Sequence, residues 1–145
     1  MNRYLKYLMW FTDVGFIVYW MVVLFGVIPE EYKYKDYQDE LMVSWNLSFL
    51  PLDLFISLTG LLSMYYLNRS VNQAASRMLA VISLSLTFCS GLQAVAFWGI
   101  RGDYDLLWWL PNLFLMIYPL VFLPGLICSR GIKEVHSYGE RRIRI

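Results

Sequence analysis

Residues 44–66 read SWNLSFLPLDLFISLTGLLSMYY, and this stretch decides the fold of the chain. It holds one charged residue, Asp53, among apolar and small polar side chains. A helix of about 20 such residues crosses the ~30 Å hydrocarbon core of a bilayer, because each residue adds ~1.5 Å. The stretch therefore predicts a membrane-spanning helix with a carboxyl group inside it.

Three more apolar segments of similar length lie at 7–28, 78–99 and 106–128. Hydrophobic residues make up 59% of the 145 residues and charged residues 16%, and the mean hydropathy is +0.49. Soluble domains usually carry about 25% charged residues. The sequence therefore predicts an all-α fold. It forms a single integral membrane domain over residues 1–145, a four-helix bundle that ends in a basic cytoplasmic tail at 129–145. The first segment lacks a small-residue cleavage pattern, so we expect it to remain as a helix.

The basic residues are distributed unevenly between the two ends of the predicted bundle. Nine of the twelve lie on the side of the two termini: Arg3, Lys6, Arg69, Arg77, Arg130, Lys133, Arg141, Arg142 and Arg144. The connections on the other side, 29–43 and 100–105, hold the remaining three together with seven acidic residues. Because cytoplasmic loops carry an excess of Lys and Arg, both termini are predicted to be cytoplasmic in a multi-pass protein of the cell membrane.

Asp13 and Asp53 lie inside predicted membrane segments. A charged side chain at the centre of a bilayer costs roughly 2.5–3.5 kcal/mol on insertion scales, so such residues usually face a polar interior with a function. A secluded carboxyl can hold a cationic ligand or exchange a proton. We therefore predict Asp13 and Asp53 as ligand-holding or catalytic acids.

Other polar and aromatic side chains share helix faces and depths with these acids. Depth in the membrane is counted at ~1.5 Å per residue. Asp53 is level with the amides Gln93 and Asn112. Asp13 is lower, level with the hydroxyl residues Ser57, Thr87 and Tyr118. The predicted ligand-binding set is Asn46, Ser57, Thr87, Gln93, Asn112, Trp20, Trp108 and Tyr118. We interpret it as one interior polar column. The alternative is that the uncharged members only join helices by hydrogen bonds, worth about 0.6 kcal/mol each.

Several kinds of chemistry are not predicted. The one histidine, His136, belongs to the predicted tail, so no intramembrane histidine can ligate a metal or act as a base. The chain has no phosphate-binding loop, Ser-His-Asp set or haem motif, and we expect no metal, cofactor or nucleic-acid partner. The expected partners are the lipid bilayer and a hydrophobic or amphiphilic small molecule. A homodimer is an alternative to a monomer.

The chain resembles the YvaD-like family of small bacterial four-helix membrane proteins. The resemblance rests on Thr12-Asp13-Val14-Gly15-Phe16, Trp45-Asn46, Pro51-Leu52-Asp53 and Trp109-x-Pro111-Asn112, and covers the chain to about residue 128. The plan also resembles, more distantly, the EXPERA superfamily of emopamil-binding and sigma-2-receptor-like proteins. That resemblance implies an intramembrane pocket for sterols or amphiphilic amines, with Asp13 and Asp53 as the matching acids. The membrane-embedded histidine of its sterol-isomerase branch is missing here.

Three functions follow as hypotheses. The first is binding of a lipid or amphiphilic small molecule in a pocket lined by the two acids. The second is an acid-base isomerase or cyclase acting on a terpenoid-like or sterol-like substrate. The third is a proton-coupled exporter of lipophilic cations, although the strong charge asymmetry disfavours the dual topology of such four-helix exporters.

Overall fold

The computed structural model describes residues 1–69 and 72–142, with side chains described as far as Cys128. These residues form helices, turns and loops, without a strand among them. The helices are α1 (Arg3–Leu24), α2 (Glu30–Lys33), α3 (Glu40–Leu47), α4 (Phe49–Arg69), α5 (Gln73–Arg101) and α6 (Leu106–Arg142). Four segments are long and apolar enough to cross a membrane: Arg3–Leu24, Glu40–Arg69, Gln73–Arg101 and Leu106–Cys128. The predicted all-α fold with four such helices is confirmed.

Helix α1 lies closer to the N-terminus than the predicted range 7–28. It begins earlier because the Asn2 side chain accepts a hydrogen bond from the Tyr4 amide and caps the first turn. It ends at Leu24 because Gly26 takes a left-handed φ of 64°, which few other residues adopt.

The second apolar segment is divided into α3 and α4 by a turn at Ser48. Pro51 has no N–H to donate to the Leu47 carbonyl, so the α-helical ladder is interrupted there. The Ser48 hydroxyl donates to the Trp45 carbonyl at 2.6 Å across the break. Pro51 thus falls in the first turn of α4, where a missing donor costs little.

Helix α5 extends past both ends of the predicted range 78–99. Its first turn is capped by the Asn72 side chain, which accepts from the Ala75 amide, and its last by Gly102 at φ 70°. Helix α6 begins at Leu106 as predicted and continues as helix to Arg142, with Pro111, Pro119 and Pro124 inside it. The predicted basic tail, 129–145, lies outside the described side chains.

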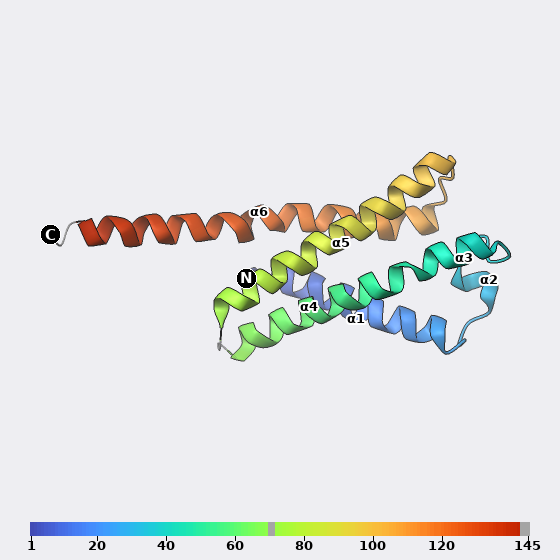
Figure 1. Ribbon diagram of the computed structural model, residues 1–145, viewed down its shortest axis with the longest axis horizontal. Helices are drawn as coiled ribbons and strands as arrows, with labels where there is room; N and C mark the ends of the chain where they lie inside the picture. Colours follow the sequence, from blue (N-terminus) through green and yellow to red (C-terminus); the bar gives the residue numbers. More distant parts are fainter. Residues whose placement is uncertain (70–71, 143–145) are drawn as a thin grey trace.

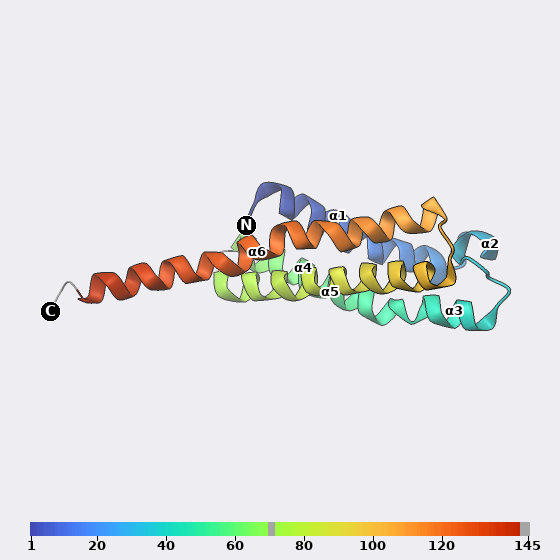
Figure 2. The same cartoon turned by 90° about the horizontal axis from the view of Figure 1, so that it is seen from above.

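The long helices neighbour one another in the order α1, α4, α5, α6. The start of α1, the end of α4 and the start of α5 lie at one end of the bundle, which we call the terminal end (Figures 1 and 2). Helices α2 and α3 and the turn between α5 and α6 lie at the other end, which we call the loop end.

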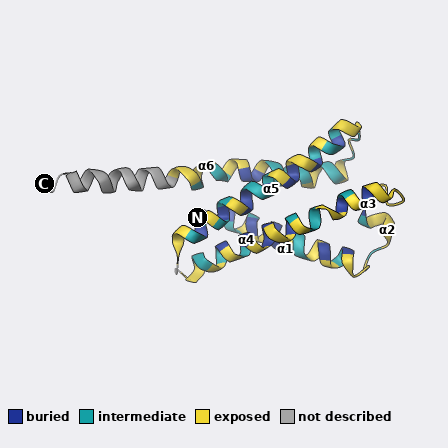
Figure 3. Ribbon diagram, in the orientation of Figure 1, coloured by how far each residue is buried: buried dark blue, intermediate teal, exposed yellow. Residues whose placement is uncertain are grey.

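The core has two parts, and buried and exposed residues alternate along the long helices (Figure 3). The cluster towards the terminal end joins three helices through Leu5, Met9, Ala80, Leu84 and Tyr118. The cluster at the loop end joins Trp20 and Val23 to Tyr34, which folds back from the loop after α2.

Two close approaches hold α5 in place. Ser63 of α4 donates to the Ser76 carbonyl at 2.7 Å, and Ser76 donates back to the Ser63 carbonyl at 2.8 Å. Gly91 lies against the backbone of α6, since a Cβ there would be 2.6 Å from the Asn112 carbonyl oxygen. Small residues at such contacts let helix backbones approach closely.

Candidate functional site

Asp53 is held at the centre of the candidate site by two neighbouring helices. The Trp20 indole N–H of α1 donates to its Oδ2 at 2.9 Å, and the Ser90 hydroxyl of α5 donates to its Oδ1 at 3.3 Å. Asp53 is 4% exposed and Trp20 2% exposed. Because both carboxyl oxygens accept a bond from a buried donor, the orientation of the group is fixed before any ligand arrives.

A cavity of about 290 Å³ lies against Asp53 in the half of the bundle nearer the loop end. Its polar lining comes from Asn46, Asp53, Ser90 and Asn112. Asn46 and Asn112 donate their side-chain amides to the Met42 and Trp108 carbonyls of their own helices, at 2.8 and 2.6 Å. Asp53 is therefore the one carboxyl group among the residues that line this cavity.

Aromatic rings make up much of the remaining wall: Phe16, Trp20, Trp45, Phe49, Trp98 and Trp108. The rings support one another, since Trp45 stacks on Phe97 at 3.9 Å between centroids and meets Trp98 edge-on at 5.7 Å. A carboxyl group among aromatic faces suits a ligand that combines a cation with an apolar body.

Charged residues at the loop end lie beside the aromatic wall of the cavity. Lys35 pairs with Asp103 at 2.6 Å and Asp105 at 3.5 Å, and its ammonium group lies 5.2 Å from the centre of the Trp98 ring. Burial alone lowers the pKa of Lys35, but the bonds and charges of Asp103 and Asp105 outweigh it and raise the pKa above its ordinary value. A second pair, Arg101 with Asp36 at 3.3 Å, links the same two connections.

The cavity opens sideways between α1 and α6. Tyr19 of α1 and Leu107 and Pro111 of α6 line it and are also exposed on the outer surface, Leu107 at 82%. The cavity therefore reaches the outer surface beside these residues of α1 and α6.

Asp13 occupies a separate place, packed against Gly60 of α4. A Cβ at position 60 would lie 2.6 Å from the Asp13 Cγ and closer still to its Oδ2. Asp13 is 1% exposed, and its Oδ2 has no hydrogen-bond partner among the described residues. Asp13 lines none of the cavities described here.

Ser57 connects the surroundings of the two acids. Its hydroxyl lies 2.9 Å from the Asp13 carbonyl oxygen of α1 and 2.9 Å from the Asp53 carbonyl oxygen of its own helix. The described contacts include no hydrogen bond between the two carboxyl groups. The acids are thus linked through backbone and one hydroxyl rather than through a shared proton.

The structure divides the predicted site residues into three groups. Those that line the cavity are Asp53, Asn46, Asn112, Trp20 and Trp108. Those near Asp13, away from the cavity, are Ser57, Thr87 and Tyr118, with Thr87 donating to the Ser83 carbonyl at 2.8 Å. Gln93 is exposed on the outside of α5, apart from both groups. The residues expected in a single polar column therefore gather around the two acids, with Ser57 between these groups, and Gln93 lies apart.

Several residues of the site were missed by the sequence analysis. Ser90 donates a hydrogen bond to Asp53, Trp98 forms part of the cavity wall, and the Lys35 ammonium group lies over the Trp98 ring. The spacing of Ser90, Ala94 and Trp98 at four residues puts them on one helix face and could have indicated the wall. No sequence signal indicates Lys35, because its role comes from a loop that folds over the bundle. Among the described residues, no cluster of three or more His, Cys, Asp or Glu side chains could hold a metal ion.

Comparison with known proteins identifies the family of this chain. A model of the family described as "Family of unknown function (DUF5360)" matches residues 5–133. The chain is 50% identical over 135 residues to the uncharacterized protein YvaD of Bacillus subtilis (strain 168), covering 93% of this chain and 99% of YvaD. No solved structure matches the chain. The predicted YvaD-like resemblance is confirmed, and the EXPERA resemblance stays a prediction. The chain belongs to the DUF5360 family.

Proposed function

We propose that this protein spans the cell membrane four times, with both termini cytoplasmic. Four helices of sufficient length and apolarity support the insertion, and so do large apolar side chains on the outer surface, such as Leu107 at 82% and Ile100 at 89% exposed. The charge asymmetry supports the orientation, since Arg69 and Arg77 lie at the terminal end.

Within that membrane, the protein binds a lipid or amphiphilic small molecule that carries a basic amine. The observation that carries this proposal is the buried Asp53 carboxyl, fixed by Trp20 and Ser90, at the wall of an aromatic cavity. An amine placed against Asp53 gains a charge-assisted hydrogen bond and contact with aromatic faces. The resemblance to the EXPERA superfamily supports the same ligand class.

The ligand enters from the lipid rather than from water. This entry is supported by Tyr19, Leu107 and Pro111, which line the cavity and are also exposed on the outside of α1 and α6. A volume of about 290 Å³ is near the lower limit for small-molecule sites, so it holds a head group and part of a chain. The rest of a long ligand extends through the side opening.

Thermal unfolding in detergent tests this proposal with a matched pair of ligands. A lipophilic tertiary amine should raise Tm by several degrees, because saturation at 100 times Kd contributes about 2.7 kcal/mol. The alcohol with the same carbon skeleton should raise it much less. Asp53→Asn should remove the difference between the two ligands, and Asp13→Asn should keep it, because Asp13 lies outside the cavity. A preference for the amine that survives Asp53→Asn contradicts the proposal.

An isomerase or cyclase acting on a terpenoid-like or sterol-like substrate is the second candidate. The unpartnered Oδ2 of Asp13 favours it, since a buried carboxyl without a partner is typical of acid-base sites. Only Asp53 lines the cavity, so Asp13 would act on a substrate there only after a movement of α1. Mass spectrometry of isoprenoid and sterol-like compounds after incubation tests this function, and turnover that survives both Asp→Asn substitutions excludes the assigned acids. Export of lipophilic cations is disfavoured by the charge asymmetry.

A further inference from the structure

A second cavity, of about 410 Å³, lies at the terminal end, far along the bundle from Asp53. Its polar lining comes from Asn2, Gln73, Ser76 and Arg77. Its apolar lining includes Leu5 of α1, Leu67 of α4 and Phe122 of α6. The cavity therefore joins a polar part, formed by the starts of α1 and α5, to an apolar part.

Arg77 is the charged side chain of this cavity. It is half-buried, and none of the lining residues is acidic. The ion pairs formed by described side chains involve only Lys35 and Arg101 among the cations, so Arg77 has no counter-ion within that part of the chain. A partly desolvated guanidinium without an anion is costly, and a bound anion that presents two oxygens to its N–H groups relieves that cost.

The N-terminal ends of α1 and α5 add positive electrostatic potential to that of Arg77. Asn2 is the N-cap of α1 and Gln73 is the first residue of α5, and both line the cavity. The N-terminus of a helix carries a partial positive charge that favours anions. Together with Arg77, these ends favour a negatively charged ligand over a neutral or zwitterionic one.

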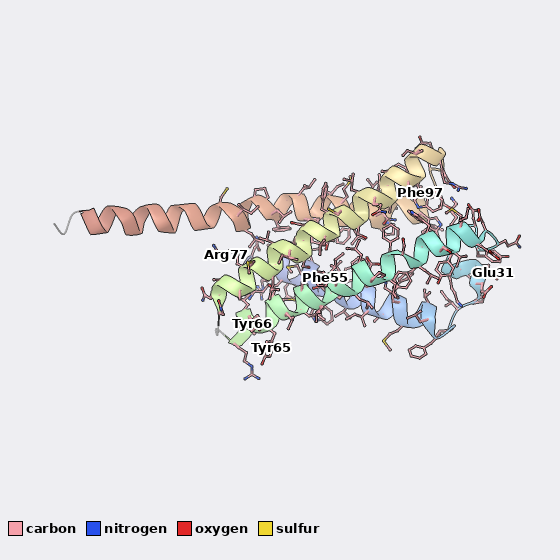
Figure 4. All side chains as sticks on the ribbon, viewed as in Figure 1. Glu31, Phe55, Tyr65, Tyr66, Arg77 and Phe97 are labelled. Atoms are coloured by element: carbon pink, nitrogen blue, oxygen red, sulfur yellow. The ribbon has the colours of Figure 1, made fainter. Side chains whose placement is uncertain are left out.

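The position of the cavity along the bundle narrows the ligand class. Helix α5 has 29 residues and so is about 44 Å long, more than the ~30 Å hydrocarbon core. Its first turns, with Gln73 and Arg77, therefore lie in the head-group region if the chain spans a bilayer, as proposed above. Figure 4 shows Arg77 at the same end of the bundle as Tyr65 and Tyr66, with Glu31 and Phe97 at the other end.

We propose that this cavity binds the phosphate of an anionic phospholipid, with the guanidinium of Arg77 as its main partner and an acyl chain along Leu5 and Phe122. The inference rests on the proposed membrane insertion but not on the amine site at Asp53. It differs from general attraction of the interface for anionic lipid, because it assigns the lipid to one arginine and one cavity.

Native mass spectrometry of the full chain with dioleoyl phosphatidylglycerol tests the assignment, using dioleoyl phosphatidylcholine as the zwitterionic reference. Arg77→Gln should weaken phosphatidylglycerol binding about tenfold, the size expected for one lost charged hydrogen-bond pair. Arg69→Gln is the matched control, since Arg69 is exposed, lies over Tyr65 and does not line the cavity. It should change binding less than twofold. Equal losses in the two variants overturn the proposal.

A second pair of variants tests the space without changing the charge. Gly125 lines the cavity, and a Cβ there meets no atom within 4 Å, so Gly125→Leu fills open space. It should reduce phosphatidylglycerol binding as strongly as Arg77→Gln. Gly15→Leu, at an equally open glycine outside the cavity, should not. Unchanged phosphatidylglycerol binding in Gly125→Leu contradicts the assignment of the lipid to this cavity.

Two further measurements separate the sources of the phosphate and the two proposals. Glycerol 3-phosphate should displace the lipid only weakly; displacement as effective as that by phosphatidylglycerol itself overturns the lipid assignment in favour of a free phosphate ester. Arg77→Gln should keep the Tm shift caused by the amine, and Asp53→Asn should keep phosphatidylglycerol binding. If the wild-type protein binds only the amine or only phosphatidylglycerol, that result shows which of the two proposals has failed.

Discussion

Gly60 leaves the space that the Asp13 carboxyl fills, and this contact couples the two residues. A Cβ at position 60 would lie 2.6 Å from the Asp13 Cγ, far inside van der Waals contact. We expect Gly60→Ala to destabilise the protein by about 1–3 kcal/mol, because overpacking of a buried contact outweighs the better helix propensity of alanine. The measurement is the free energy of unfolding in mixed micelles.

The control for this prediction is a double-mutant cycle. In an Asp13→Ala background the carboxyl is gone, so the added methyl group of Gly60→Ala meets open space. The substitution should then be neutral or stabilise by up to about 1 kcal/mol through helix propensity. The same destabilisation in both backgrounds would show that Asp13 does not occupy the space beside Gly60.

At this scale the sequence predicts faces well and neighbours poorly. At about 100° per residue, Thr87 and Ser90 lie within about 40° of Ser83 around α5, whereas Gln93 lies about 80° away. Gln93 therefore turns out of the bundle while the other three are buried. Helical periodicity contains this difference, but depth alone, which placed Gln93 level with Asp53, does not.

The ion pairs at the loop end join two connections that are distant in sequence, the loop after α2 and the turn before α6. Asp103→Asn should lower the free energy of unfolding by about 1 kcal/mol, because Lys35 is only 19% exposed in this pair. Asp36→Asn is the matched control, since its pair with Arg101 is 43% exposed on both sides and should contribute less than about 0.5 kcal/mol. Equal effects would mean that the Lys35 pair is no more than a surface contact.

The same pair gives a defined pH dependence. The pKa of Lys35 is raised above its ordinary value of 10.5, so its contribution is fully present below that value and is lost as pH rises through the folded-state pKa. The Tm difference between the wild-type chain and Lys35→Met should therefore be constant from about pH 7 to about pH 9 and shrink only above 10.5. A difference that already falls between those lower values contradicts the raised pKa.

Helix ends were the elements hardest to predict. The apolar segments gave the four spans, but the caps at Asn2 and Asn72 lie in polar sequence that hydropathy places outside the helices. The break at Ser48 follows from Pro51, whose missing donor is visible in the sequence, whereas the apolar stretch 44–66 by itself predicts one continuous helix. Hydropathy shows which residues are apolar enough for the hydrocarbon core, whereas the capping residues determine where the backbone hydrogen bonds of each helix begin and end.

For the whole molecule, composition predicted the number of long helices, and the short connection 67–77 predicts that the second and third are neighbours. The sequence left the places of the first and fourth helices open. The side opening between α1 and α6 depends on the packing order, since α1 neighbours α4 and α6 neighbours α5. The aromatic wall depends on it too, because Trp20, Trp45, Trp98 and Trp108 come from four different helices. Contacts between elements distant in sequence are determined by packing, which local patterns do not encode.

Orientation in the membrane is a property of the whole chain, and charge asymmetry predicts it with a direct test. The acidic and tyrosine-rich connections at the loop end should face outward, and the end with Arg69 and Arg77 should face the cytoplasm. Tyr104 and Asn68 are exposed at the two ends, so each serves as a single-cysteine site after Cys89 and Cys128 are replaced by serine. In intact cells a membrane-impermeant maleimide should label Tyr104→Cys and not Asn68→Cys, and lysis should make both reactive. Labelling of Asn68→Cys alone in intact cells would reverse the assigned orientation and place the Arg77 cavity in the outer leaflet.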